Sequence, residues 1–295
     1  MTLQYDPEYQ AVVAANDRGP APAPDARERP RDQDPFTSHD GAEVGLHRFA
    51  TKEMAEAAEP QAAVVYVHGG GFVAGSVDIF APQVKRFVAS SGMPFFAVDY
   101  RLAPEFPGGV GAEDVFHALR HLSEHAAEWN ARHDGGLGGR RDRGGRDADR
   151  AGPRAGAPLR RQVLVYPMLD DRTALAEDSA VFPLLTWKTS DSLLAWRAVL
   201  GDKAGRPEAE GVSLYAAPGR AGVEDLRGLP RTYVDVGSLD LFRDECVEFV
   251  GKLARADVEV EFHLWPGLPH GFESAPGIGW VRKALEARNA ALRRE

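Results

Sequence analysis

A glycine-rich loop, an aspartate and a histidine are the parts of this chain whose residue types suit acyl transfer. His68-Gly69-Gly70-Gly71 follows directly after an apolar run at 62–67. Glycines let the backbone approach a substrate closely, and preorganised backbone N–H groups stabilise the oxyanion formed in acyl transfer. Asp240 and His270 lie far downstream, each just after an apolar run. A histidine base oriented by a buried carboxylate completes such an apparatus.

Two other aspartates compete with Asp240 for the role of the orienting acid. Asp235 falls inside an apolar strand pattern, and Asp244 falls inside the helical pattern that follows. Asp240 occupies the connection between the two patterns, where catalytic loops collect in parallel sheets. Of the three aspartates, Asp240 is therefore the best placed to orient His270.

The nucleophile that this pair needs is missing from the sequence. A serine is expected in a G-x-S-x-G turn between the glycine loop and the aspartate, and no such pentapeptide occurs in the 295 residues. Residues 131–157 instead contain eight Gly, seven Arg, five Ala and four Asp, with Leu137 as the one large apolar side chain. A segment of this composition has nothing to bury, so it cannot form a core strand.

The flanking sequence alternates between strand and helix patterns. Short apolar runs predict strands at 43–50, 62–67, 95–99, 162–166, 232–236 and 258–264. Helical periodicity predicts a short helix at 5–15 and longer ones at 81–90, 110–128, 240–255 and 279–293. This alternation predicts an α/β protein with a mostly parallel central sheet and helices on both faces.

Two stretches depart from the alternation. Residues 18–35 are rich in Pro, Arg and Asp, which predicts a linker. Residues 180–217 predict a helical insertion above the sheet. We therefore divide the chain into an N-terminal cap segment with a linker at 1–41 and a main domain at 42–295, which carries the cap insertion at about 180–217.

Composition limits the partners and the compartment. A net charge of -9 argues against nucleic acid and anionic membranes as partners. The first residues lack the pattern of a signal peptide, and no apolar run approaches the ~20 residues needed to span a bilayer. Cys246 is the single cysteine, which fits a reducing compartment. We expect a cytoplasmic protein without a membrane span; a homodimer is compatible with the sequence, which does not determine the oligomeric state.

Five stretches in this order resemble the hormone-sensitive-lipase-like branch of the α/β-hydrolases, a family of carboxylesterases. They are His68–Phe72, Asp99–Glu105, Val163–Leu169, Asp240 with Arg243–Glu245, and His270–Phe272. The resemblance covers roughly residues 42–130 and 158–285. It implies an α/β-hydrolase fold with a helical cap, an acyl-serine mechanism, a small-molecule ester substrate of short to medium chain length, and no cofactor.

The resemblance also implies a role for each motif residue. Gly70 and Gly71 correspond to the donors of the oxyanion hole, and His68 and Gly69 complete the motif as structural residues. Asp240 corresponds to the acid and His270 to the base.

Three explanations of the missing serine stay open. The chain is a non-catalytic small-molecule binder of the same fold, or Ser213 in Gly211–Tyr215 substitutes, or residues 131–157 are a frame-shifted reading of a GC-rich gene. The frame shift explains the composition best, because shifted GC-rich codons encode Gly, Arg, Ala, Pro and Asp. One permitted back-translation of Gly136–Arg140, GGA CTC GGC GGG CGG, encodes Asp-Ser-Ala-Gly when read one base later. Without the serine, the chain as printed is expected to be nearly inactive.

The remaining polar motifs are interpreted as structural. Arg101 and Glu105 are expected to tie a loop behind the glycine turn. His117, His121 and His125 are spaced four apart, which favours one solvated helix face over a row of metal ligands. We therefore predict no metal.

Overall fold

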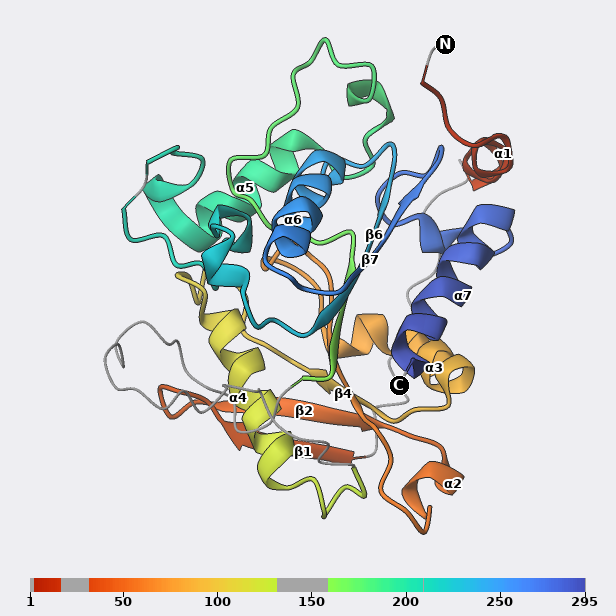
Figure 1. The fold of residues 1–295 in the computed structure, drawn as a ribbon, viewed down its shortest axis with the longest axis vertical. Coiled ribbons are helices and arrows are strands. Elements are labelled where there is room, and N and C mark those ends of the chain that lie inside the picture. Colours follow the sequence, from red (N-terminus) through yellow and green to blue (C-terminus); the bar gives the residue numbers. More distant parts are fainter. Residues whose placement is uncertain (1–2, 17–31, 132–158, 209, 295) are drawn as a thin grey trace. The chain divides into compact units, whose positions relative to one another are not determined.

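The computed structural model describes residues 3–16, 32–131, 159–208 and 210–294 (Figure 1). The chain divides into two units, and each has its own sheet. We call residues Asp25–Arg160 the glycine-loop unit, and Met1–Pro24 with Arg161–Glu295 the histidine unit.

The glycine-loop unit contains a mixed four-stranded sheet in the order β1-β2-β4-β3. Its strands are β1 (Asp32–Thr37), β2 (Glu43–Phe49), β3 (Val64–Val67) and β4 (Phe95–Val98). β1 pairs antiparallel with β2, and β2 pairs antiparallel with β4, whereas β3 and β4 are parallel. β3 is therefore an edge strand among the described residues.

Two helices cover opposite faces of this sheet, α3 (Val77–Ser91) and α4 (Val110–Glu124). Phe87 of α3 stacks on Phe95 with ring centroids 6.0 Å apart. Phe96, the next residue, is buried in a cluster with Leu122 of α4. Neighbouring strand residues point to opposite faces, so the two helices must lie on different sides. The four-residue helix α2 (Lys52–Ala55) is capped by the Thr51 hydroxyl.

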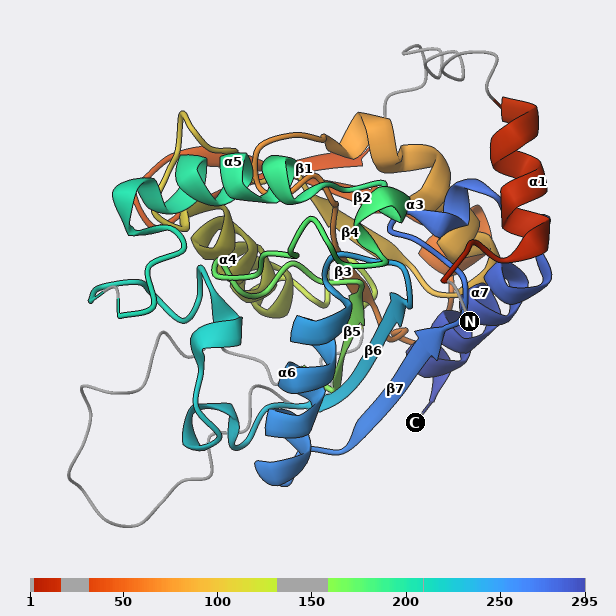
Figure 2. The ribbon, with the colours of Figure 1, turned by 90° about the horizontal axis from the view of Figure 1, so that it is seen from above.

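The histidine unit contains a parallel three-stranded sheet in the order β5-β6-β7. Its strands are β5 (Arg161–Val165), β6 (Arg231–Gly237) and β7 (Val260–Trp265). Figures 1 and 2 show α6 (Arg243–Arg255) and α7 (Gly279–Arg293) on opposite faces of this sheet. Each helix turns an apolar stripe toward the strands: Phe249 and Leu253 from α6, and Val281 and Ala284 from α7, are buried.

The N-terminal helix α1 (Pro7–Asn16) packs within the histidine unit through the buried ring of Tyr9. Glu8 accepts a hydrogen bond of 2.6 Å from the N–H of Gly279, at the start of α7. Tyr5 donates to the carbonyl of Leu184 at 2.8 Å. The two segments that we expect to form a cap are thus joined by a direct hydrogen bond.

The insertion at 180–217 is built from one α-helix and short 3₁₀ turns. α5 (Thr189–Leu200) buries Trp196 completely. The 3₁₀ turns of the unit are η1 (Phe182–Leu184), η2 (Gly201–Lys203), η3 (Pro218–Arg220), η4 (Glu224–Leu226) and η5 (Phe272–Ser274).

The α/β fold class is confirmed, and each predicted strand and helix occurs with ends shifted by four residues or fewer. The prediction of a linker at 18–35 is wrong for residues 32–35, which belong to β1. Pairing with β2 and burial of Phe36 outweigh the polar composition there, and β1 is an edge strand, where proline is tolerated. The rest of that linker and residues 132–157 lie outside the described residues.

Two of the predicted strands, β3 and β5, are only partly buried. Val67 at the end of β3 is 44% exposed, and every residue of β5 is only partly buried. Both strands are edges of their sheets within the described part of the chain, so each has one side without a neighbouring strand.

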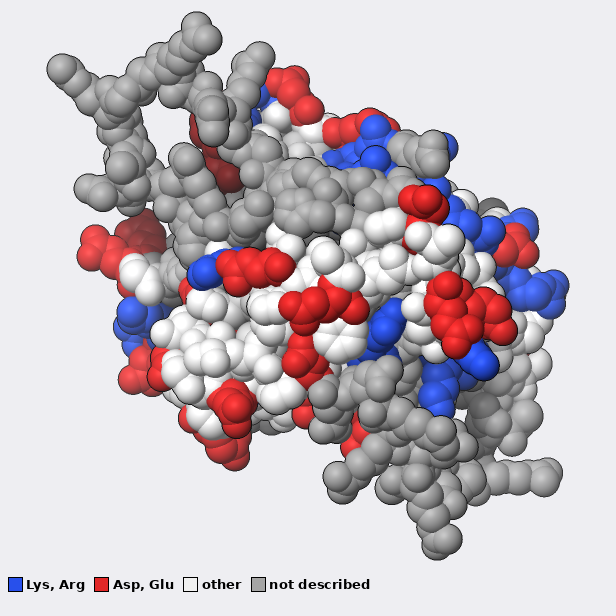
Figure 3. Space-filling model, turned by 90° about the horizontal axis from the view of Figure 1, so that it is seen from below, with Lys and Arg blue, Asp and Glu red and all other residues white. Residues whose placement is uncertain are grey.

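Acidic side chains are spread among basic and uncharged ones on the face drawn in Figure 3. Within the described residues, no helix has the length and apolar content needed to cross a bilayer.

Candidate active site

The loop after β3 turns sharply at its glycines. Gly70 and Gly71 have φ values of 123° and 61°, and the N–H groups of Val73 and Ala74 both donate to the carbonyl of Gly70, at 3.1 and 3.0 Å. A Cβ atom on Gly70 would lie 2.0 Å from the carbonyl oxygen of Ala74. The turn therefore requires glycine at position 70.

Aromatic side chains hold the beginning of the loop. The His68 ring lies between Tyr100 and Phe80, with centroid distances of 4.3 and 5.5 Å. The Tyr100 hydroxyl donates to the carbonyl of His68 at 2.8 Å. Burial lowers the pKa of His68, so the ring is neutral near pH 7. His68 thus packs between aromatic rings at the start of the loop, and its structural role in the motif stays a prediction.

Two N–H groups of the loop remain available. Within the described part of the chain, neither the N–H of Gly70 nor that of Gly71 donates a backbone hydrogen bond. The carbonyl of Phe72 accepts from the N–H of Ala103 at 2.9 Å, which fixes the far side of the turn. Free, neighbouring donors in a rigid turn are what an oxyanion site requires.

Gly70→Ala should lower the free energy of unfolding by at least about 2 kcal/mol more than Gly41→Ala. Both glycines have positive φ, 123° and 85°, but nothing lies within 4 Å of a Cβ at Gly41. Urea unfolding of the two variants measures the difference. Equal losses would show that the close approach to Ala74 is relieved at no cost.

Asp240 and His270 are brought together in the histidine unit, from segments that follow β6 and β7. Asp240 Oδ2 accepts a hydrogen bond from His270 Nδ1 at 2.9 Å, and its Oδ1 accepts from the N–H of Phe242 at 2.9 Å. The Asp240 side chain is fully buried, and that of His270 is 23% exposed. Because a carboxylate only accepts, Nδ1 carries the proton and Nε2 presents its lone pair. This arrangement suits a general base.

Three aromatic rings surround the imidazole of His270. The centroids of Tyr166, Phe242 and Trp187 lie 4.3, 5.4 and 6.0 Å from that of His270. The hydroxyl of Thr186 donates to the carbonyl of His270 at 2.7 Å. Trp187 and Thr186 come from the insertion, so the insertion forms part of the surroundings of the histidine.

The rival aspartates have other partners. Asp235 is buried and accepts from Arg288 Nε at 2.7 Å, from the hydroxyl of Tyr233 at 3.0 Å and from Trp265 Nε1 at 3.2 Å. Asp244 pairs with its neighbour Arg243 at 2.7 Å on the surface. Of the three candidate acids, only Asp240 contacts His270.

Ser213 does not lie at a strand-to-helix turn. It is exposed in the segment between η2 and η3, and its hydroxyl oxygen accepts from the N–H of Tyr215 at 3.2 Å. The expected elbow segment, 131–157, lies outside the described residues after Ala131.

The prediction that Arg101 and Glu105 both tie a loop behind the glycine turn is wrong for Glu105. Arg101 binds Asp114 at 2.7 Å and Asp40 at 2.7 Å, while Glu105 is exposed. Asp114 is fully buried in the first turns of α4 and also accepts from the hydroxyl of Ser38. A buried carboxylate has more need of a fixed partner than an exposed one, so tertiary burial selected Asp114.

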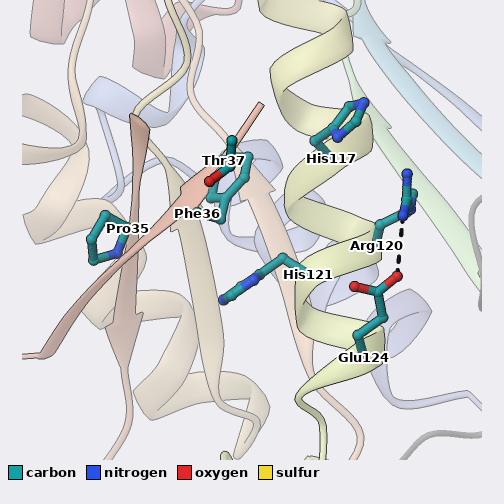
Figure 4. A pocket seen from close by; sticks show the side chains of 7 residues that line it. All are labelled: Pro35, Phe36, Thr37, His117, Arg120, His121 and Glu124. Atoms are coloured by element: carbon teal, nitrogen blue, oxygen red, sulfur yellow. Dashed lines mark hydrogen bonds and ion pairs between the residues drawn. The ribbon is translucent and has the colours of Figure 1, made fainter. Parts of the chain in front are cut away.

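His117 and His121 of α4 line a groove beside β1 (Figure 4), whereas His125 follows the end of the helix. His121 Nε2 lies 2.9 Å from a carboxylate oxygen of Asp34, and His125 Nδ1 lies 2.9 Å from the carbonyl of His121. Arg120 pairs with Glu124 along the helix, as the dashed line shows. Among the described residues, no three His, Cys, Asp or Glu side chains are grouped as a metal site.

Glu245 is a buried carboxyl in the first turn of α6. Its Oε1 accepts from the N–H of Leu169 at 2.6 Å. Burial raises the pKa of Glu245 to about 8, against a smaller lowering by hydrogen bonds from Thr173 and Leu169. The group therefore stays protonated in the folded chain at pH values where it is ionised in the unfolded chain.

Glu245→Gln should change how stability depends on pH. Between pH 4.5 and 8 the unfolded glutamic acid releases its proton and the folded one keeps it, so the parent chain loses stability as the pH rises. Relative to Glu245→Gln, the loss should reach about 3–5 kcal/mol by pH 8. Urea unfolding of both chains at several pH values measures this, and parallel curves would contradict it.

Comparison with known proteins agrees with this fold and set of motifs. Residues 64–274 match the family described as alpha/beta hydrolase fold. Over 236 residues the chain is 33% identical to Esterase LipI of Mycobacterium tuberculosis (strain ATCC 25618 / H37Rv), covering 78% of this chain and 70% of LipI. Carboxylesterase NlhH of Mycobacterium tuberculosis (strain CDC 1551 / Oshkosh) is 32% identical over 246 residues, covering 78% of this chain and 71% of NlhH.

A solved structure titled Bacterial Heroin Esterase has a TM-score of 0.77 and 26% identity, and the match covers 99% of this chain and 98% of that one. The chain therefore belongs to the α/β-hydrolase family, within its hormone-sensitive-lipase-like branch of carboxylesterases. The family-level function is that of a carboxylesterase-type serine hydrolase.

Proposed function

We propose that this gene encodes an esterase that hydrolyses carboxylic esters through an acyl-serine intermediate. The observation that carries the proposal is the hydrogen bond of 2.9 Å between His270 Nδ1 and the buried carboxylate of Asp240. Such a pair serves a nucleophile, and family membership supplies the reaction class.

Each residue has one role in the proposed mechanism. His270 Nε2 takes the proton of the serine hydroxyl as its oxygen attacks the ester carbonyl, and the N–H groups of Gly70 and Gly71 stabilise the oxyanion. The imidazolium, held by Asp240, then gives the proton to the departing alcohol. Water repeats the sequence on the acyl-enzyme and releases the acid and the serine.

The chain as printed lacks the serine, and we propose that a frame-shifted reading of about codons 131–157 is the cause. Residues 131–157 contain one large apolar side chain, while the sequence on both sides forms regular strands and helices. The chain also keeps Asp240 and His270, which are hydrogen-bonded to each other. Among the described residues, β3 is an edge strand that has no neighbouring strand on one side. A restored apolar strand would supply that neighbour.

The register next to β3 supports the same proposal. Ala131, the first residue of the block, forms a parallel bridge with Gln61. In a restored chain, a strand that continued this register would place codon 138 beside His68. The back-translation puts the serine across codons 137 and 138, and paired residues on neighbouring strands lie about 5 Å apart. The serine would thus arrive at the glycine loop.

A non-catalytic small-molecule binder is the second candidate. The printed sequence favours it, because the chain has no G-x-S-x-G and a triad without its serine loses about a million-fold in turnover. The nucleotide sequence of the block separates the two candidates.

We expect a preference for soluble short-chain esters over emulsified triglycerides. The support is the insertion, whose Phe182, Leu185 and Trp187 pack in one apolar cluster with Phe242, next to His270. A series of p-nitrophenyl esters from acetate to palmitate, assayed with the restored chain, measures the preference. A maximum at long acyl chains would contradict it.

A further inference from the structure

Next to His270, the histidine unit contains a buried polar network that the proposed hydrolysis does not use. Arg288 of α7 is 1% exposed. It binds both carboxylate oxygens of Asp235, through Nε at 2.7 Å and Nη2 at 3.1 Å. Its Nη1 lies 3.7 Å from Glu273 Oε2, and Glu273 Oε1 accepts a hydrogen bond from the hydroxyl of Tyr166. The network therefore runs from Asp235 to Tyr166.

Tyr166 connects this network to the imidazole. It directly follows β5, and its ring centroid lies 4.3 Å from that of His270. Its backbone has φ +33°, a value that is rare for a residue with a side chain and costs about 1–3 kcal/mol. The Tyr166 N–H donates to the carbonyl of Asp235 at 2.7 Å. Neighbouring contacts therefore hold Tyr166 in a conformation that it would not adopt alone.

The segment that carries His270 is held at two points. Glu273 lies three residues after His270 and is bound by Tyr166 and Arg288. The carbonyl of His270 itself accepts from Thr186 at 2.7 Å. The guanidinium of Arg288 also lies 4.9 Å from the ring centroid of Phe272, between the two points in sequence. Release of Glu273 would therefore remove one of the contacts that hold the His270 segment.

We propose that Tyr166 is a positioning residue for His270. Its hydroxyl fixes the His270 segment through Glu273, and its ring limits rotation of the imidazole, so that Nδ1 stays on Asp240. The catalytic importance of Tyr166 rests on the proposed role of His270 as the base. The contacts of Tyr166 with Glu273 and His270 are present in the chain as printed. Burial also raises the pKa of Tyr166 well above its usual value, so the hydroxyl remains a donor to Glu273.

The test follows the proton on His270 Nδ1 by NMR in the chain as printed. A proton shared between imidazole and a buried carboxylate resonates far downfield, and its absence from His270→Gln identifies it. Tyr166→Phe keeps the ring and removes the hydroxyl. We expect this variant to speed exchange of that proton with water by at least about tenfold, the effect of losing a hydrogen bond to a charged group.

Tyr233→Phe is the matched control. Tyr233 is another buried tyrosine that donates to a carboxylate of the same network, at 3.0 Å from Asp235, but its ring contacts His263. The Tyr233→Phe variant should lose about as much free energy of unfolding in urea as Tyr166→Phe. It should leave the exchange rate of the His270 proton unchanged. Unchanged exchange in Tyr166→Phe, or equal acceleration in Tyr233→Phe, would overturn the proposal.

A second variant covers the case in which Tyr166→Phe does not fold. Glu273→Ala keeps the Tyr166 ring and removes the acceptor of its hydroxyl, so the same acceleration is expected. If Glu273→Ala folds with unchanged exchange, the proposal is wrong. Neither measurement needs ester turnover, so a failure here is distinct from a failure of the esterase proposal. In the restored chain, Tyr166→Phe should lower kcat about tenfold with KM unchanged.

Discussion

Restoring the reading frame across about codons 131–157 should raise ester hydrolysis by at least about a thousand-fold and stabilise the fold in the same step. Removing the serine of a comparable triad lowers kcat about a million-fold. The activity that remains comes from the oxyanion hole and substrate binding alone. The same codons would supply a strand to pair with β3, which is an edge strand among the described residues, and the helix behind the elbow. A strand and a helix bury further apolar area, and a domain's whole stability is only about 5–15 kcal/mol, so the gain should be measurable. Turnover of p-nitrophenyl butyrate and urea unfolding measure the two gains.

Resequencing codons 131–157 tests whether the block is frame-shifted. We expect one alternative frame to encode a serine flanked by glycines, followed by an apolar helical pattern. Replacement of that serine by alanine in the restored chain is the control, because it should keep the gain in stability and remove the gain in activity. If neither alternative frame contains such a serine, the frame-shift proposal is wrong and the non-catalytic binder replaces it. Turnover by the printed chain that His270→Ala abolishes would instead overturn our placement of the nucleophile.

Asp240→Asn should lower the kcat of the restored chain by about four orders of magnitude. Asp240 Oδ2 now accepts from His270 Nδ1 in a fully buried position. An amide there can present its N–H₂ group instead, which favours the tautomer with the proton on Nε2, where the base must accept. Steady-state kinetics at pH 7 measure the loss, and KM should change little because the substrate contacts remain.

Asp244→Asn is the matched control for this substitution. Asp244 lies four residues away and pairs with Arg243 on the surface. Exposed ion pairs contribute about 0–1 kcal/mol, so this variant should keep its activity within about fivefold. A large loss in Asp244→Asn, with little in Asp240→Asn, would reassign the acid.

Strands and helices with a strong local pattern were predicted close to their observed ends. α7 begins and ends at the predicted residues, 279 and 293, because its apolar positions recur at helical spacing. β1 was missed, because Asp-Gln-Asp-Pro carries no strand pattern and its strand depends on pairing with β2, at a distance along the chain. Elements that depend on long-range pairing are not visible in a local window.

The sequence predicted some features of the candidate site, and others depended on the fold. The sequence by itself determined which residues could act, since His-Gly-Gly-Gly, Asp240 and His270 each follow a recognisable strand in the order of a known family. Their catalytic roles remain predictions. Only the tertiary structure decided which polar groups are buried together: Asp114 with Arg101, and Tyr166 with Glu273, 107 residues apart. A buried polar group must find a partner wherever the fold brings one, so its partner depends on packing and not on sequence distance.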